Sequence, residues 1–153
     1  MTSAEPLPRI LLVEDNRADA RFALHALRAA GLGGVAHLAR DGIEALEYLL
    51  AEGSEMRLGA IRVVFLDIKL PKLDGIEVLR RIRSDPRTAT LPVVMFTSSG
   101  ESRDRWACRA LGVNGYVVKP VAFAELSTTV VRMAEDWLES DGPGARPPDP
   151  RDH

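Results

Sequence analysis

Short apolar runs alternate along the chain with longer segments in which apolar residues recur every three or four positions. The clearest run, residues 63–66, has no polar alternation, which is typical of a strand buried on both faces of a parallel sheet. Five such strands are predicted, at residues 10–13, 35–39, 63–66, 92–96 and 115–118. Because a helical pattern follows each run, the sequence predicts an α/β fold with helices on both faces of the sheet.

Five helices are expected after these strands. The first has apolar residues between 18 and 30, ends at Gly31, and can be capped by Asn16 or Asp15. The remaining helical patterns fall at residues 43–50, 76–82, 101–111 and 122–138. The segment from Gly53 to Gly59 is predicted to be a polar, flexible loop.

Right-handed crossover connections leave few topologies for such a chain. The predicted one is the flavodoxin-like (βα)5 doubly wound sheet with strand order 2-1-3-4-5. In this order the chain changes direction between strands 1 and 3, so the crevice at their carboxyl ends is the expected ligand site.

The last predicted helix carries two apolar stripes. Five of its residues recur at helical spacing and should face the sheet: Phe123, Leu126, Val130, Met133 and Trp137. Val131 and Leu138 lie off this stripe, and they indicate either a partner surface or scattered exposed apolar residues.

The 153 residues suffice for one domain with a substantial core. The net charge of −2 argues against non-specific nucleic-acid binding, and no apolar run approaches the roughly 20 residues of a membrane span. The N-terminus lacks the basic and apolar regions of a signal peptide. A single cysteine, Cys108, excludes an intrachain disulfide and a cysteine-rich zinc site. We therefore expect a cytoplasmic protein that binds neither nucleic acid nor membrane.

The chain divides into a leader at residues 1–8, a domain at residues 9–139 and a Pro/Gly-rich tail at residues 140–153. The composition of the tail predicts disorder or polyproline structure, unless it serves as a dimer arm. Because the tail is too short to fold as an effector domain, we expect output through a partner.

Polar side chains follow four of the predicted strands. Glu14 and Asp15 follow the first strand, Asp67 the third, Thr97 the fourth and Lys119 the fifth. The strand order brings these strand ends to one crevice. Three carboxylates so close together repel one another unless a cation intervenes, and an oxygen-only ligand set favours Mg²⁺.

With a cation bound, Asp67 can act as a nucleophile toward phosphorus. The carbonyl of Lys69, just past Asp67, is placed by chain geometry to be a third protein ligand. The Lys119 ammonium can stabilise a transferring phosphoryl group, and the Thr97 hydroxyl can donate a hydrogen bond to it. Thr97 could instead cap the following helix, and Lys119 could be a solvated lysine.

Together these residues resemble the receiver domain of two-component response regulators. The resemblance rests on residues 11–16, 66–67, 71, 74–75, 97–98 and 119–120, and it covers the whole predicted domain. It implies that Asp67 is the phosphoacceptor, with Glu14, Asp15 and the Lys69 carbonyl as Mg²⁺ ligands. It also implies Thr97 and Tyr116 as a switch pair and a cis peptide bond before Pro120. From the residues alone, Tyr116 could equally be a half-buried packing residue on an edge strand.

A finer resemblance is to the single-domain regulators that accompany phytochrome-type histidine kinases. It rests on residues 13–16, 18–19, 66–71, 97–99, 114–116, 119–121 and 137–138. It implies a bacteriophytochrome-type sensor kinase as phosphodonor and a homodimer built on C-terminal elements. Output would be partner binding or phosphorelay through the surface of the last two helices and the last strand. The chain would catalyse only its own phosphorylation and dephosphorylation.

Two other functions remain open. A phosphohydrolase of the haloacid dehalogenase type needs a second carboxylate two residues after the nucleophile, where this chain has Lys69. A flavodoxin-like flavin binder needs a hydroxyl- and glycine-rich phosphate loop after the first strand, where this chain has the acidic segment 14–17.

Overall fold

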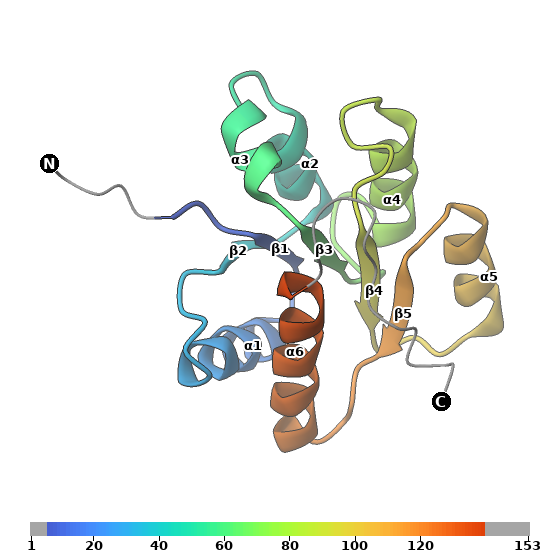
Figure 1. Cartoon of the computed structure of the whole chain (residues 1–153). Helices are drawn as coiled ribbons and strands as arrows, with labels where there is room; N and C mark the ends of the chain where they lie inside the picture. The colour runs from blue at the N-terminus through green and yellow to red at the C-terminus, as the bar shows by residue number, and fades with distance from the viewer. Residues whose placement is uncertain (1–5, 140–153) are drawn as a thin grey trace, which may run out of the picture.

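A five-stranded parallel sheet forms the centre of the molecule (Figure 1). The computed structural model describes residues 6–139. The strands run in the order β2-β1-β3-β4-β5, which confirms the predicted topology. Their bounds are β1 (Ile10–Val13), β2 (Ala36–Ala39), β3 (Val63–Leu66), β4 (Val93–Thr97) and β5 (Gly115–Val118).

Helices cover both faces of the sheet in the described part of the chain. They are α1 (Arg17–Ala29), α2 (Gly42–Leu50), α3 (Glu55–Ala60), α4 (Gly75–Ser84), α5 (Ser102–Ala110) and α6 (Phe123–Leu138). Helices α1 and α6 lie side by side and share one apolar cluster with the sheet (Figure 1). Helices α2 and α4, with Cys108 of α5, share the cluster on the opposite face.

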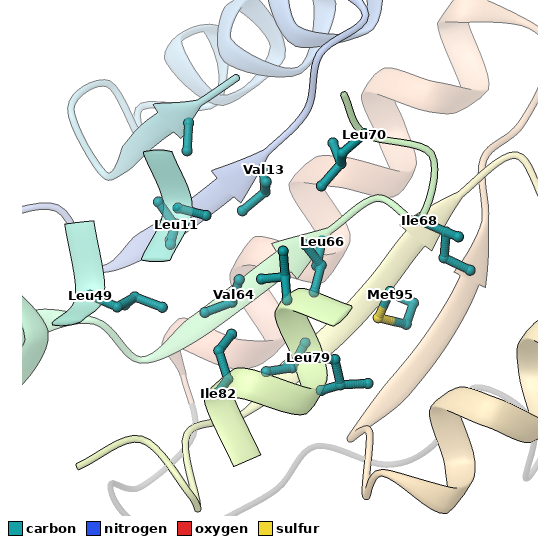
Figure 2. Packing of buried hydrophobic residues seen from close by; sticks show 14 of the residues in the cluster. Leu11, Val13, Leu49, Val64, Leu66, Ile68, Leu70, Leu79, Ile82 and Met95 are labelled. Atoms are coloured by element: carbon teal, nitrogen blue, oxygen red, sulfur yellow. The ribbon is translucent and has the colours of Figure 1, made fainter. Parts of the chain in front are cut away.

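The apolar runs form strands because their side chains are buried on both faces. All four residues of β1 and all four of β3 are buried. Figure 2 shows alternate residues of these strands, such as Leu11, Val13, Val64 and Leu66, pointing into the same cluster as Leu79 of α4. Backbone hydrogen bonds to neighbours on both sides hold the central strands in register, so the polar residues that follow them are fixed as well.

The segment predicted as a loop, residues 53–59, contains most of a short helix, α3. Periodicity missed it because six residues are too few for a clear helical stripe. Tertiary contacts hold it instead. Arg57 donates to the backbone oxygens of Tyr48 and Glu47 at the end of α2, at 2.6 and 3.2 Å. The hydroxyl of the buried Ser54 donates to the backbone oxygen of Leu49.

Four of the five residues assigned to the inner stripe of α6 are buried, as expected, but Phe123 is 47% exposed. Phe123 is the first residue of α6, beyond the reach of the sheet, and its ring stacks on Phe22 of α1 at 4.1 Å between centroids. The off-stripe residues Val131 and Leu138 are half-buried, and Leu138 packs against the cluster beneath α6. Neither is a fully exposed apolar side chain.

The expected cis peptide before Pro120 is wrong, because the described residues contain only trans peptide bonds. The trans isomer is the one that X–Pro bonds favour intrinsically, by roughly 0.5–1 kcal/mol. The prediction of a dimer arm at residues 140–153 lies outside the described residues. Within residues 6–139, no helix has both the length and the apolar character needed to cross a membrane.

Candidate functional site

The carboxyl ends of β1 and β3 bring three acidic side chains together. Val13 and Leu66 are register partners, and the N–H of Asp67 donates to the backbone oxygen of Val13 at 3.2 Å. Carboxylate oxygens of Glu14, Asp15 and Asp67 consequently all lie within 4.8 Å of one another. Glu14 and Asp67 are buried, with 3% and 5% of their surfaces exposed, whereas Asp15 is exposed.

Lys119 joins this cluster from the end of β5. Its buried ammonium lies 2.5 Å from Oε1 of Glu14, 2.9 Å from Oδ2 of Asp67 and 3.0 Å from Oδ2 of Asp19. An ammonium has three N–H donors, so the three carboxylates match its full donor capacity. The structure therefore joins Lys119 to the predicted acidic residues and contradicts the alternative of a solvated lysine.

Burial and neighbouring charges act in opposite directions on the pKa values of Glu14 and Lys119. Burial raises the pKa of Glu14 to about 7, against the hydrogen bond and charge of Lys119, which lower it. Burial alone would lower the pKa of Lys119, but hydrogen bonds and charges from Glu14 and Asp67 outweigh it and raise that pKa above its ordinary value. Lys119 thus stays charged at neutral pH, and Glu14 holds its proton more readily than an exposed glutamate.

Both oxygens of Asp67 are held in place. The N–H of Ile68 donates to Oδ1 at 2.7 Å, and Lys119 donates to Oδ2. The loop behind them is tight: the N–H of Gly75 donates to the Ile68 oxygen at 2.7 Å, and a Cβ at Gly75 would overlap the Asp67 carbonyl oxygen. A glycine is therefore required where α4 begins against the Asp67 backbone.

Lys69 has an exposed side chain just past Asp67. Its backbone carbonyl accepts no hydrogen bond from the described residues, in contrast to the neighbouring Ile68 carbonyl, which accepts two. The lone pairs of the Lys69 carbonyl are therefore available for a metal ion, as its predicted role as a Mg²⁺ ligand requires.

The other two predicted residues, Thr97 and Tyr116, are linked through Ser99. Thr97 is fully buried at the end of β4, and its hydroxyl oxygen accepts from the Ser99 N–H at 3.3 Å. The Tyr116 hydroxyl donates to the Ser99 carbonyl at 2.7 Å, while Arg105 lies over its ring. Ser99 also donates through its own hydroxyl to Asp104 of α5 at 2.5 Å. Thr97 does not cap α5, whose N-cap is Glu101.

The sequence did not predict the contacts of two residues of this site. Asp19, on the first turn of α1, was assigned no role, although it is one of the carboxylates around Lys119. Its place in the first turn of a helix that begins directly after the carboxyl end of β1 could have indicated this. The position of Ser99 between Thr97 and Tyr116 has no counterpart in the sequence pattern, because it arises from a loop conformation.

The donor set fits a small, hard divalent cation. Its members are carboxylate oxygens that converge within 4.8 Å of one another, and the Lys69 carbonyl follows two residues after Asp67 in the chain. Oxygen-only ligands, with no histidine or thiolate, are those preferred by Mg²⁺ and Mn²⁺. Glu14, Asp15, Asp67 and the Lys69 carbonyl are the residues that could hold such an ion.

Comparison with known families and proteins gives a consistent result. A family model described as the response regulator receiver domain matches residues 10–131. The probable methanogenesis regulatory protein FilR2 of Methanothrix harundinacea is 42% identical over 138 residues, covering 88% of this chain and 88% of that protein. Response regulator Rcp1 of Synechocystis is 34% identical over 137 residues, covering 90% of this chain and 93% of that protein.

Solved structures agree. The phosphorylated cyanobacterial phytochrome response regulator RcpA is 37% identical, with a TM-score of 0.78, covering 87% of this chain and 95% of that one. The Mn²⁺-bound form of Rcp1 is 32% identical, with a TM-score of 0.77, covering 90% and 100%. The bacteriophytochrome response regulator AtBRR is 44% identical, with a TM-score of 0.64, covering 84% and 94%.

Proposed function

Because the chain belongs to the response regulator receiver domain family, we propose that it accepts a phosphoryl group on Asp67 from a sensor histidine kinase. The observation that carries the proposal is the environment of Asp67. A buried carboxylate is held by a backbone N–H and an ammonium, and it lies beside two further carboxylates. Receiver domains bind Mg²⁺ or Mn²⁺ at an acidic cluster of this kind.

The proposed transfer makes one bond and breaks one. An oxygen of Asp67 forms a bond to phosphorus while the P–N bond of a phosphohistidine on the kinase breaks, and its electron pair stays on the imidazole nitrogen. The product is an aspartyl phosphate. Ile68 and Lys119 fix the plane of the carboxylate beforehand, which removes part of the entropic barrier to attack.

Mg²⁺ held by Glu14, Asp15, Asp67 and the Lys69 carbonyl would supply positive charge for the phosphoryl oxygens. The chain itself supplies the Lys119 ammonium, which is already at 2.9 Å from Asp67. Its raised pKa keeps it charged throughout the physiological range. Lys119 can therefore turn from the carboxylate to a phosphoryl oxygen without gaining or losing a proton.

The signal would leave the site through Thr97, Ser99 and Tyr116. A phosphoryl group on Asp67 adds about −1.5 to −2 charges and attracts hydroxyl donors such as Thr97. The Thr97 hydroxyl oxygen accepts a hydrogen bond from the N–H of Ser99. The Ser99 carbonyl in turn accepts from the Tyr116 hydroxyl, and the Ser99 hydroxyl donates to Asp104 of α5. Movement of Thr97 would thus shift the surface formed by α5, β5 and α6, the surface we propose for partner binding or phosphorelay.

Tyr116→Phe tests this route. The variant lacks the hydroxyl that holds the Ser99 carbonyl, so phosphorylation should change amide hydrogen exchange in α5 and β5 less than in the wild type. Tyr48→Phe is the matched control, since Tyr48 stacks on His37 far from Ser99. Equal exchange changes in wild type and Tyr116→Phe would contradict the proposed route.

The kinase we propose is of the bacteriophytochrome type. The support is the likeness to RcpA and AtBRR, which are phytochrome and bacteriophytochrome response regulators. Phytochrome-associated receivers work with histidine kinases. We also propose a homodimer through C-terminal elements. A molar mass of one chain by light scattering, with and without phosphorylation, would exclude that dimer.

We infer no turnover of external substrates. Position 69, where a phosphohydrolase of the haloacid dehalogenase type would need a carboxylate, is a lysine whose side chain is exposed. The flavin alternative lacks support as well, because the loop after β1 begins with Glu14 and Asp15, where a flavodoxin-like phosphate loop needs hydroxyl and glycine residues.

Phosphotransfer profiling tests the proposal. Candidate histidine kinases are autophosphorylated with labelled ATP and mixed with the chain in Mg²⁺. We expect rapid transfer from a phytochrome-type kinase to the wild type and none to Asp67→Asn. Transfer only from kinases of other sensor types would reject the phytochrome pairing alone, whereas equal labelling of Asp67→Asn would reject Asp67 as the acceptor.

A further inference from the structure

A cationic cavity lies between α1 and the carboxyl end of β2. It has a volume of about 480 Å³, and four arginines line it: Arg17, Arg21, Arg28 and Arg40. The whole chain carries a net charge of −2, so this concentration of positive charge is local. We refer to this space as the arginine-lined cavity.

The four guanidinium groups have no partner of their own in the described part of the chain. None of them makes an ion pair or a side-chain hydrogen bond with any residue from 6 to 139. Several other arginines are engaged: Arg80 pairs with Glu77, Arg87 pairs with Asp85, and Arg83 donates to three backbone oxygens. The four unpaired groups named above line one space, where their donors can serve a ligand.

The spacing along α1 explains why three of them line the same wall. Positions 17, 21 and 28 are separated by four and seven residues, so they lie on one face of the helix. Eleven residues of helix span about 16 Å, which gives a row of positive charge rather than a point. Arg40, directly after β2, lines the cavity from the sheet edge.

The floor of the cavity is apolar. Leu24 of α1 and Leu38 of β2 line it, and both are half-buried residues packed against the cluster beneath α1 and α6. Ala20, which is buried, completes this surface. Small-molecule sites combine such a floor with a few charged groups, and they have volumes of roughly 300–1,000 Å³. The cavity therefore suits an anion with an organic body better than a bare inorganic ion.

We propose that the arginine-lined cavity binds an organic polyphosphate of nucleotide size. Guanidinium groups pair with phosphate oxygens through two parallel hydrogen bonds, and several of them together select ligands with more than one negative charge. The ring-shaped body of the ligand would rest on Leu24 and Leu38. Glu14 and Asp15 also line the cavity, so they would repel the phosphates and keep them at the arginines.

This site is distinct from the acceptor site, although the two share a border. Asp67 and Lys119 do not line the cavity. Glu14 and Asp15 border both sites. A charge change at Asp67 should therefore alter the affinity of the cavity for its ligand, and the bound ligand should alter the equilibrium of that charge change by the same factor. The proposal itself does not require phosphorylation of Asp67.

The test is a titration of the ¹⁵N-labelled full chain with ADP, pyrophosphate and adenosine in separate experiments, with EDTA present. EDTA prevents phosphates from reaching the acidic cluster through a metal ion. We expect ADP to bind more tightly than pyrophosphate, and adenosine to bind weakest. The amide signals of Leu24 and Leu38 should shift.

Two triple variants give the matched comparison. Arg21→Gln, Arg28→Gln and Arg40→Gln together should weaken ADP binding at least about tenfold, given the strength of charge-assisted hydrogen bonds. The control replaces three arginines on α4 and α5 and removes the same net charge: Arg80→Gln, Arg81→Gln and Arg103→Gln. It should retain nearly all of the affinity.

Several results would overturn the proposal. Equal weakening by both triple variants would mean non-specific attraction to positive charge. Equal affinity for ADP and pyrophosphate would mean that only an adventitious ion is bound. Binding that appears only when Mg²⁺ replaces EDTA would assign the phosphates to the acidic cluster, and a preference for an oligoglutamate peptide over ADP would assign the cavity to an acidic polypeptide.

Discussion

At the scale of single residues, Lys119 is the centre of the site. It contacts carboxylates that come from the end of β1, the first turn of α1 and the end of β3. Removing any one partner leaves the ammonium paired, whereas removing Lys119 would leave two buried carboxylates, Glu14 and Asp67, facing each other uncompensated. Removing one partner of a buried ion pair destabilises a protein far more than replacing the whole pair, because it leaves a buried charge without compensation.

Glu14 makes the stability of the metal-free protein depend on pH. Its pKa is raised by burial from 4.5 to about 7, so the folded state binds more protons than the unfolded state between these values. Stability should therefore fall as pH rises through this window. Thermal unfolding in EDTA from pH 5 to pH 7.5 measures it.

Glu14→Gln is the control for that pH series, because it removes the titrating group and keeps the shape. Its unfolding temperature should depend less on pH over the same range. If wild type and Glu14→Gln show the same pH dependence, Glu14 does not titrate in this window. Mg²⁺ should restore stability more at the upper end of the range, where Glu14 has lost its proton.

At the scale of elements, the loop from β3 to α4 positions the acceptor. Asp74 caps α4 by accepting from the Glu77 N–H at 3.0 Å, and Gly75 lets the helix begin against the Asp67 backbone. Lys72 has a φ of +69°, a conformation that costs a residue with a Cβ some energy. The backbone of the loop is thus fixed from both ends.

Gly75→Ala should disturb this loop. The added methyl group has no space beside the Asp67 carbonyl, and relieving such overlap costs about 1–3 kcal/mol of unfolding free energy. Chemical denaturation measures the loss, and phosphorylation of Asp67 should slow as well.

Gly59→Ala is the matched control for that substitution. Gly59 lies in α3, a Cβ there would meet no atom within 4 Å, and alanine favours helices over glycine by about 1 kcal/mol. This variant should be as stable as the wild type or more so. A Gly75→Ala protein as stable as Gly59→Ala would mean that the loop accommodates a Cβ at position 75 without strain.

At the scale of the whole molecule, apolar runs and strand order were enough to predict the sheet and the meeting of Glu14, Asp15, Asp67 and Lys119 at one edge. Each apolar run is followed by a polar residue, so the carboxyl ends of the strands could be located from sequence.

Features that depend on tertiary contacts could not be predicted in this way. Helix α3 is held by Arg57 on the end of α2, and Phe123 turns away from the sheet to stack on Phe22. The Ser99 hydrogen bonds depend on a loop conformation, and the ion pair of Asp19 joins residues 100 positions apart. None of these contacts produces a periodic pattern of apolar residues in the sequence.

Intact mass spectrometry after incubation with acetyl phosphate and Mg²⁺ shows whether Asp67 accepts a phosphoryl group. Acetyl phosphate needs no kinase, so the result depends on this chain alone. We expect one added phosphoryl group on the wild type, located at Asp67 by peptide mapping, and none with EDTA or on Asp67→Asn. No adduct on the wild type, or the same adduct on Asp67→Asn, would contradict this expectation.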